Sequence, residues 1–194
     1  MRKLALVLLI AVCMVFVGMA DMVFAGADTG SAPPSKLNAY ALNTLTKIGT
    51  DGTIIKAVKA KNASGESMAA VLELDAKWKA EEGVADYMQA LMDNDCAQYV
   101  KKIRDNDDAI FEIFVMDNQG AIVCETDKTG DYWQGDEAKW QQSYAAGNGG
   151  VFFIEGIEFD TGMNANICQV SVPVMDGGKA IGAITFGINI DKVK

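Results

Sequence analysis

The sequence contains no histidine, and this absence excludes several kinds of chemistry at once. Without imidazole the chain can form neither a Ser-His-Asp triad, nor a Cys-His dyad, nor a zinc site that needs a histidine ligand. It also lacks a glycine-rich phosphate loop and a nucleophile elbow, and no pair stands out among its many carboxylates. We therefore expect a protein that is not an enzyme and that uses no cofactor or metal.

Basic side chains are scarce as well. The chain has 17 Lys and Arg against 26 Asp and Glu. Removing the N-terminal residues up to Ala25 leaves 15 basic and 25 acidic side chains, a formal charge of −10. A surface this negative repels phosphate backbones, so nucleic acid is not expected as a partner.

Long hydrophobic runs are limited to one, Leu4 to Ala20, which follows Arg2 and Lys3. A positive start, an apolar run and the small or branched side chains of Val23-Phe24-Ala25 are typical of a secretion signal. We predict cleavage after Ala25 and a periplasmic or secreted protein. An uncleaved membrane anchor is the alternative, because the run is close to the lower limit for spanning a bilayer.

Cysteine is rare, and only Cys96, Cys124 and Cys168 remain after the predicted cleavage. An odd number in an oxidising compartment allows at most one internal disulfide and leaves at least one free thiol. No two of them form a C-x-x-C pair.

The order of the predicted elements indicates one α+β domain. After a signal peptide (1–25) and a flexible tether (26–34), the domain covers 35–194, with helices in 35–105 and a sheet in 109–190. An insertion at 126–150, which contains a helix over 137–146, separates the second strand from the third. The hydrophobic patterns predict a five-stranded antiparallel sheet with strands at 110–116, 121–125, 151–159, 166–174 and 179–190.

Several segments carry a resemblance to a known family. They are DGTIIKAVKAKN (51–62), LDAKW (74–78), FVMDNQG (114–120), TGDYWQGDEAKW (129–140), VPV (172–174) and IGAI (181–184). Together, and in this order, they resemble Cache domains, the extracytoplasmic PAS-like sensor modules also called PDC domains. The resemblance implies a long N-terminal helix behind the sheet and a ligand pocket on the other face, roofed by the insertion. It also implies that the first and last strands are central and that the second strand lies at one edge.

This implied strand order bears on the cysteines. It puts Cys124 and Cys168 three strands apart, roughly 14 Å, whereas a disulfide needs Cα atoms within about 7 Å. Cys96, just before the first strand, would reach Cys124 more easily. Three free buried thiols remain the alternative.

The segment TGDYWQGDEAKW concentrates aromatic rings and carboxylates within twelve residues. Rings beside carboxylates suit a cationic ligand, and rings alone suit a planar or apolar metabolite. Alternatively, the rings fill the roof of the domain while Gly135 or Asp136 caps the following helix. Elsewhere, Glu112 is the one charge inside an apolar strand, so we expect it to pair with a ligand cation or with a structural Lys or Arg, or else to lie on the wet side of the pocket. By alternation, Gln169 and Ser171 lie on the polar face of their strand. The predicted ligand-binding residues are therefore Tyr132, Trp133, Asp136, Trp140, Glu112, Asp131, Gln169 and Ser171.

These observations favour an extracytoplasmic, small-molecule-binding, sensor-type domain. Its expected ligand is an amino acid, an amine, a carboxylate or a similar metabolite. Because no second membrane helix and no output domain follow the last strand, we expect it to act with a separate membrane receptor or transporter. The alternative is an envelope protein-interaction module without a ligand. The sequence leaves open whether the domain forms a homodimer.

Overall fold

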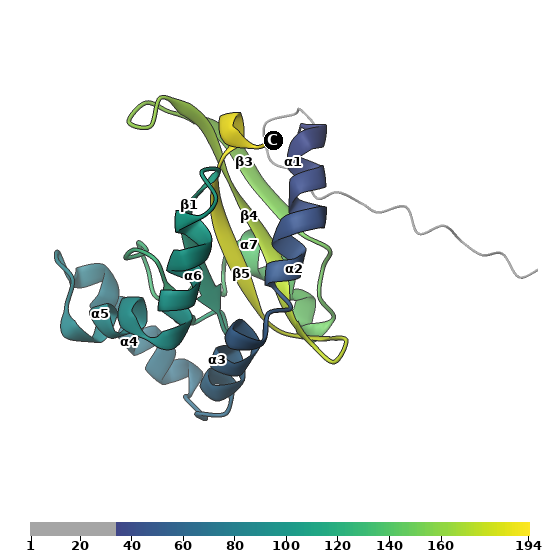
Figure 1. Cartoon of the computed structure of the whole chain (residues 1–194). Coiled ribbons are helices and arrows are strands. Elements are labelled where there is room, and N and C mark those ends of the chain that lie inside the picture. The colour runs from purple at the N-terminus through teal and green to yellow at the C-terminus, as the bar shows by residue number, and fades with distance from the viewer. Residues whose placement is uncertain (1–33) are drawn as a thin grey trace, which may run out of the picture.

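The computed structural model describes residues 34–194. The predicted signal peptide and the tether up to residue 33 lie outside this range. Within it, no helix is both long and apolar enough to cross a membrane. The chain forms one sheet with helices on both faces (Figure 1).

The sheet has five strands in the order β2-β1-β5-β4-β3, and every neighbouring pair is antiparallel. The strands are β1 (Ile110–Met116), β2 (Ile122–Glu125), β3 (Phe153–Asp160), β4 (Ala165–Asp176) and β5 (Lys179–Asn189). The α+β class and the five antiparallel strands are as predicted. The strand order confirms the PAS-like fold that the resemblance to Cache domains implies, with β2 at one edge.

One face of the sheet is covered by the N-terminal helices and by α6 (Asp95–Asp105) (Figure 1). The segments α1 (Ser35–Tyr40), η1 (Ala41–Leu45, a π-helical stretch) and α2 (Thr46–Ile48) run on as one helix. Then α3 (Gly52–Asn62) follows Asp51, whose side chain caps it by accepting from the Thr53 N–H. Alternate residues of β4 point into this core, which buries Leu37, Leu45, Ile54, Val58, Cys168, Val170, Val172 and Val174.

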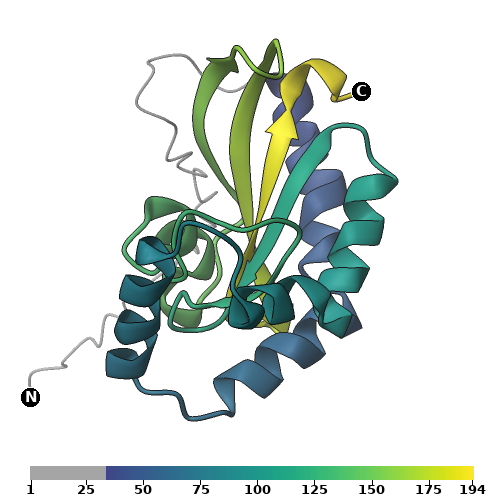
Figure 2. The same cartoon turned by 90° about the vertical axis from the view of Figure 1, so that its left-hand side faces the viewer.

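The opposite face is covered by the insertion and by α4 (Met68–Ala80), with α5 (Asp86–Asp93) beside the β2 edge (Figure 2). In the insertion, α7 (Ala138–Tyr144) runs into a 3-10 turn, η2 (Ala145–Gly147), and another, η3 (Ile190–Lys192), follows β5. This side has its own core, which includes Val71, Trp78, Met88, Phe114, Met116 and Tyr132.

The side chain of Asn94 caps α6 by accepting from the Ala97 N–H. Glu137 is the N-cap residue of α7, and no side chain there accepts a capping hydrogen bond. Neither Gly135 nor Asp136 therefore plays the capping role considered for it.

A disulfide joins Cys96 at the start of α6 to Cys124 on β2, with Cα atoms 5.9 Å apart. It is the pair that the implied strand order favoured over Cys124–Cys168, and Cys168 is buried as a free thiol. The bond ties the short edge strand to the helix layer.

We predict that replacing both cysteines (Cys96→Ala with Cys124→Ala) lowers the free energy of unfolding by about 3.5 kcal/mol. The two residues are 28 apart in sequence, and closing a loop of this length restricts the unfolded chain by about that amount. Urea unfolding of residues 26–194 measures the change, and the unaltered chain in reductant is the control. In denaturant without reductant, that chain should show a single reactive thiol, and three would contradict the pairing.

Candidate functional site

The aromatic side chains of the insertion are packed against the protein itself. Tyr132 is only 1% exposed, its ring centroid lies 5.7 Å from that of Trp78, and its hydroxyl accepts a hydrogen bond from Lys61 at 2.8 Å. Trp133 donates from its ring to the Gln119 carbonyl at 2.8 Å. Trp140 donates to the Asp117 carbonyl at 3.0 Å, and its ring stacks on Tyr144. These three rings form an ordered roof, and a ligand role for them stays a prediction.

The two aspartates of the segment lie in different environments. Asp131 is half-buried, and its carboxylate lies 3.6 Å from the Lys79 ammonium. Burial raises the pKa of Asp131, and repulsion from Glu137 raises it further, while Lys79 opposes the shift. Asp136 is exposed. The binding role predicted for both stays a prediction.

The roof is held in place by Asp75, a buried residue of α4 that lies within the LDAKW segment. One carboxylate oxygen accepts from the backbone N–H groups of both Tyr132 and Trp133 at 3.0 Å. The other pairs with Lys79 at 2.7 Å. A carboxylate that accepts two backbone N–H groups fixes the loop more firmly than a neutral acceptor would.

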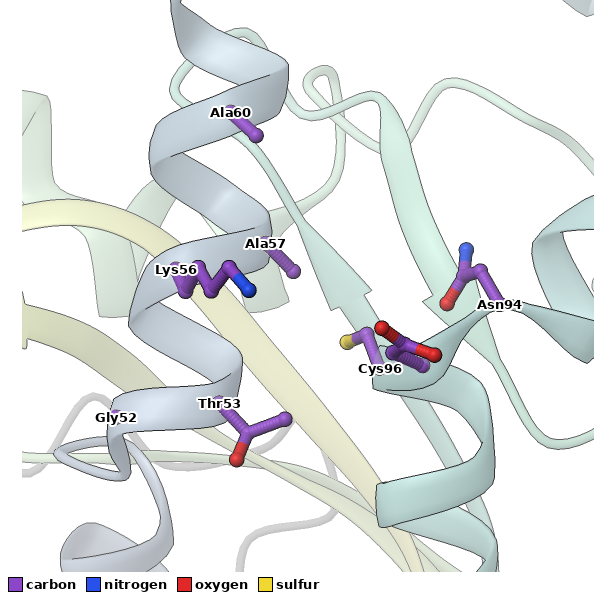
Figure 3. A pocket seen from close by; sticks show the side chains of 8 residues that line it. Gly52, Thr53, Lys56, Ala57, Ala60, Asn94 and Cys96 are labelled. Carbon is purple, nitrogen blue, oxygen red and sulfur yellow. The ribbon is translucent and has the colours of Figure 1, made fainter.

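One hollow of about 600 Å³ lies on the helix-covered side, between α3 and the start of α6. Figure 3 shows Thr53, Lys56 and Ala57 on one wall and Asn94 and Cys96 on the other. The Asn94 side chain is occupied by capping α6 and by donating to the Val123 carbonyl. None of the predicted ligand-binding residues lines this hollow.

A second hollow, of about 470 Å³, lies on the roofed side between α7 and strands β1, β3 and β4. This volume is within the range of small-molecule sites. Two predicted residues, Glu112 and Gln169, line it. The complete lining is Phe111, Glu112, Lys139, Glu155, Gly156, Glu158, Ile167, Cys168 and Gln169.

The strand register brings the polar residues of this cavity into one row. Glu112 of β1 pairs with Gly187 of β5, Gly187 pairs with Gln169 of β4, and Gln169 pairs with Glu155 of β3. Gly187 lies in the middle of this row, and a Cβ there would come within 2.6 Å of the Phe111 ring. Because glycine has no side chain, Phe111 can lie over the strand and Glu112 and Gln169 can meet across it.

Three side chains form a continuous polar chain along the cavity. Lys139 of α7, 8% exposed, donates to the Gln169 side-chain oxygen at 2.9 Å, and the Gln169 nitrogen donates to Glu112 at 3.1 Å. Lys139 also pairs with Glu137 at 2.5 Å, and Glu155 lies 3.9 Å away. Burial raises the pKa of Glu112, while the Gln169 hydrogen bond and the Lys139 charge oppose the shift.

Ser171 lies one row further along the same face as Gln169. It is fully buried, and its hydroxyl is 2.7 Å from that of Thr185. The predicted set is thus divided between the roof, the cavity and this buried pair, and a ligand role for Ser171 stays a prediction.

Sequence reasoning missed Lys139, Glu155 and Gly187. Lys139 is the only basic residue in TGDYWQGDEAKW, and this could have marked it in the sequence. In the structure it is buried on the same helix face as Ser143, four residues later. Glu155 and Gly187 had no local signal, because their importance comes from the register across four strands.

The carboxylate of Glu125, the last residue of β2, is fully buried where the insertion begins. One oxygen accepts from the Thr129 N–H at 3.2 Å and from its hydroxyl at 2.9 Å. Its other oxygen has no hydrogen-bond partner among residues 34–194. Burial raises the pKa of Glu125 to about 7, with smaller contributions from Glu112 and Asp127 and with the Thr129 hydrogen bonds opposing.

Metal binding finds no support in this part of the chain. Within residues 34–194, no three Asp, Glu, Cys or His side chains converge as metal ligands.

Together, the sheet order and the roofed cavity define an α+β domain of PAS-like architecture. No family model matches the chain, and no curated protein does.

Three solved structures illustrate the matches at the level of structure. The sensor domain of the histidine kinase DctB from V. cholerae has a TM-score of 0.44 at 12% identity, over 81% of this chain and 50% of that one. The sensory domain of the Campylobacter jejuni chemoreceptor Tlp3 with isoleucine bound has 0.37 at 16%, over 84% and 66%. The ligand-binding domain of the Pseudomonas aeruginosa PAO1 amino acid chemoreceptor PctC in complex with GABA has 0.35 at 14%, over 78% and 63%.

The chain therefore spans between 50% and 66% of the length of these solved chains.

We predict that Glu125 makes stability depend on pH. Its pKa is about 7 in the folded chain against an ordinary value of 4.5, so the folded state holds the proton more tightly. This contribution is complete below about pH 4.5 and is lost as pH rises to about 7, a decrease of roughly 3 kcal/mol. Between pH 4.5 and 8, the Tm measured by thermal unfolding should fall less steeply for Glu125→Gln than for the unaltered chain. Glu73→Gln, an exposed change on α4, is the control, and parallel profiles for all three proteins would disprove this role.

We also predict that Asp75→Ala destabilises the domain by roughly 3 kcal/mol, because two backbone N–H groups lose a charged acceptor. Asp75→Asn keeps an acceptor oxygen and should cost roughly 1 kcal/mol. Urea unfolding followed by tryptophan fluorescence measures both. Glu73→Ala on the same helix should stay within about 0.5 kcal/mol of the unaltered chain. Equal losses for the alanine and asparagine variants would show that the shared acceptor does not hold the roof.

Proposed function

We propose that this chain is an extracytoplasmic, sensor-type domain that binds a small molecule between α7 and strands β1, β3 and β4. The observation that carries the proposal is the 470 Å³ cavity with the polar chain Lys139–Gln169–Glu112 along it. Cavities of this size with a few convergent polar groups are typical small-molecule sites. The groups stand on a rigid sheet and one helix, so their positions are set before a ligand arrives.

The chemistry of the cavity favours binding over catalysis. Cys168 lines the cavity, but its side chain belongs to the core on the other face of the sheet, where burial raises the pKa of the thiol to about 12 and keeps it protonated and unreactive. The polar chain holds an ammonium, an amide and a carboxylate in mutual hydrogen bonds, an arrangement that recognises charge without activating a nucleophile. These features support a protein that captures a ligand unchanged.

A ligand in this position would touch the insertion and the sheet at the same time. Lys139 belongs to the insertion, while Glu112 and Gln169 belong to β1 and β4, the two strands that flank the central strand β5. Occupancy would therefore change the balance of contacts that hold α7 on β4 and β5. We propose that a separate membrane receptor or transporter detects this change.

One observation favours a second candidate, an envelope interaction module without a ligand. The space beneath residues 129–133 is filled by the domain's own rings rather than left hollow. Phe159 and Met163, at the β3–β4 turn, are 57% and 42% exposed and offer apolar surface to a protein partner. This candidate requires the adjoining cavity to remain without a ligand.

The two candidates separate in a thermal unfolding screen of residues 26–194 with amino acids, amines, carboxylates and nucleobases. A ligand at a hundredfold excess over its Kd should stabilise the domain by about 2.7 kcal/mol, which raises Tm by roughly 5–10 °C. Gly156→Leu should abolish this shift. Gly156 lines the cavity, and a Cβ added there meets nothing within 4 Å, so a larger side chain fits at this wall without disturbing the backbone and should obstruct the hollow.

The matched control is Gly83→Leu, which places the same side chain in open space away from the cavity. It should leave the shift unchanged. A panel that leaves Tm unaltered would count against ligand binding and in favour of the interaction module, whereas a shift that persists in Gly156→Leu would place the ligand outside this cavity.

A further inference from the structure

We propose that the ligand of this cavity is a small organic cation, an alkyl amine or guanidine without a carboxylate, and that Glu112 pairs with its charge. This inference rests on the proposed binding function and narrows it to one ligand class.

The charges of the lining are unequal. Three carboxylates, Glu112, Glu155 and Glu158, face one ammonium, that of Lys139. Lys139 is already paired with Glu137 on its own helix at 2.5 Å and with Gln169 at 2.9 Å. The positive charge is therefore largely neutralised by a residue outside the lining, and the cavity keeps an excess of negative charge for an occupant.

Glu112 has an oxygen to offer. Its Oε1 accepts from Gln169, while no hydrogen bond to its Oε2 is formed by the other described residues. The side-chain amide of Gln169 cannot flip without placing its nitrogen against the Lys139 ammonium. Its nitrogen therefore faces Glu112, which accepts the hydrogen bond. A half-buried carboxylate with one free oxygen is costly to ionise alone, and a cationic group beside it offsets that cost.

The remaining walls suit the uncharged part of such a ligand. Phe111 and Ile167 line the cavity on β1 and β4. The Phe111 ring rests over Gly187, where a side chain would displace it. An alkyl stem can pack on these two side chains while its charged end reaches Glu112, and an aromatic face nearby favours a cation further.

A carboxylate on the ligand would meet the opposite conditions. Two of the three N–H groups of Lys139 already donate to Gln169 and Glu137, so a ligand carboxylate could take only the third. It would then stand among Glu112, Glu155 and Glu158, and like charges at this range repel strongly outside bulk water. Anions and zwitterions are thus disfavoured by the same residues that favour an amine.

The test is a titration of residues 26–194 with matched probes, in which binding is measured by calorimetry and by the shift in Tm. The cationic probes are butylamine, 1,4-diaminobutane and agmatine. Butanoate is the anion, 4-aminobutanoate the zwitterion and 1-butanol the neutral analogue. We expect only cationic probes to bind, and Gly156→Leu to abolish their binding.

Two variants that each remove one charge then assign the charge. Glu112→Gln should weaken the binding of the cationic probes by about tenfold or more, because a charge-assisted hydrogen bond is lost. Lys139→Gln should tighten it, because a like charge is removed. Glu73→Gln, which changes the net charge equally on an exposed part of α4, is the control and should leave Kd unchanged. The probe series on the unaltered chain decides the class even if Glu112→Gln does not fold.

The outcomes separate the two proposals. Binding of butanoate or 4-aminobutanoate that is lost in Gly156→Leu and weakened in Lys139→Gln would overturn the cation while leaving ligand binding in place. Amine binding that Glu112→Gln does not weaken would overturn the role of Glu112. Failure of all three cationic probes to bind would overturn this inference, and the proposed function would fall as well only if the wider metabolite panel also left Tm unaltered.

Discussion

A missing side chain in the middle of the sheet is the constraint on which the candidate site depends. At Gly187 the row that runs from Glu112 to Glu155 contains no Cβ, and this gap lets Phe111 fold over β5 while Gln169 reaches Glu112. The same row positions Lys139, because its ammonium binds the Gln169 oxygen. A larger residue at this one place would separate the carboxylate from the amide and close the space between them.

The roof of the domain depends on a different kind of contact. Its aromatic side chains fill space, but two buried carboxylates determine its path. Glu125 accepts a hydrogen bond from Thr129, and Asp75 accepts hydrogen bonds from the backbone N–H groups of Tyr132 and Trp133. Since buried carboxylates are stable only when their oxygens accept hydrogen bonds, the loop and the two acids stabilise one another. The rings therefore have the structural role that the sequence also allowed, whereas the cavity lies beside them.

The sequence was a good guide wherever the information was local. Apolar periodicity identified the five strands and the helices, and alternation in β4 correctly separated Val170 from Gln169. Glu112 was found because a charge inside an apolar strand needs a partner. Its direct partner Gln169 was also among the predicted residues, but Lys139 could not be found this way, since it meets Gln169 only after α7 has packed on the sheet. Gly187 carried even less signal, because a glycine in a strand acquires meaning only from its neighbours across the sheet.

The Cys96–Cys124 bond has a mechanical consequence for the insertion. It secures the polypeptide one residue before Glu125, where the roof starts, whereas the far end of the roof runs through Ala145, Ala146 and Gly147, all at positive φ. The two ends therefore differ: the first is linked to α6 by a disulfide, and the second consists of three residues in left-handed conformations. The insertion is thus anchored covalently at the β2 edge of the sheet, while at the β3 edge only the polypeptide chain itself connects it to the sheet.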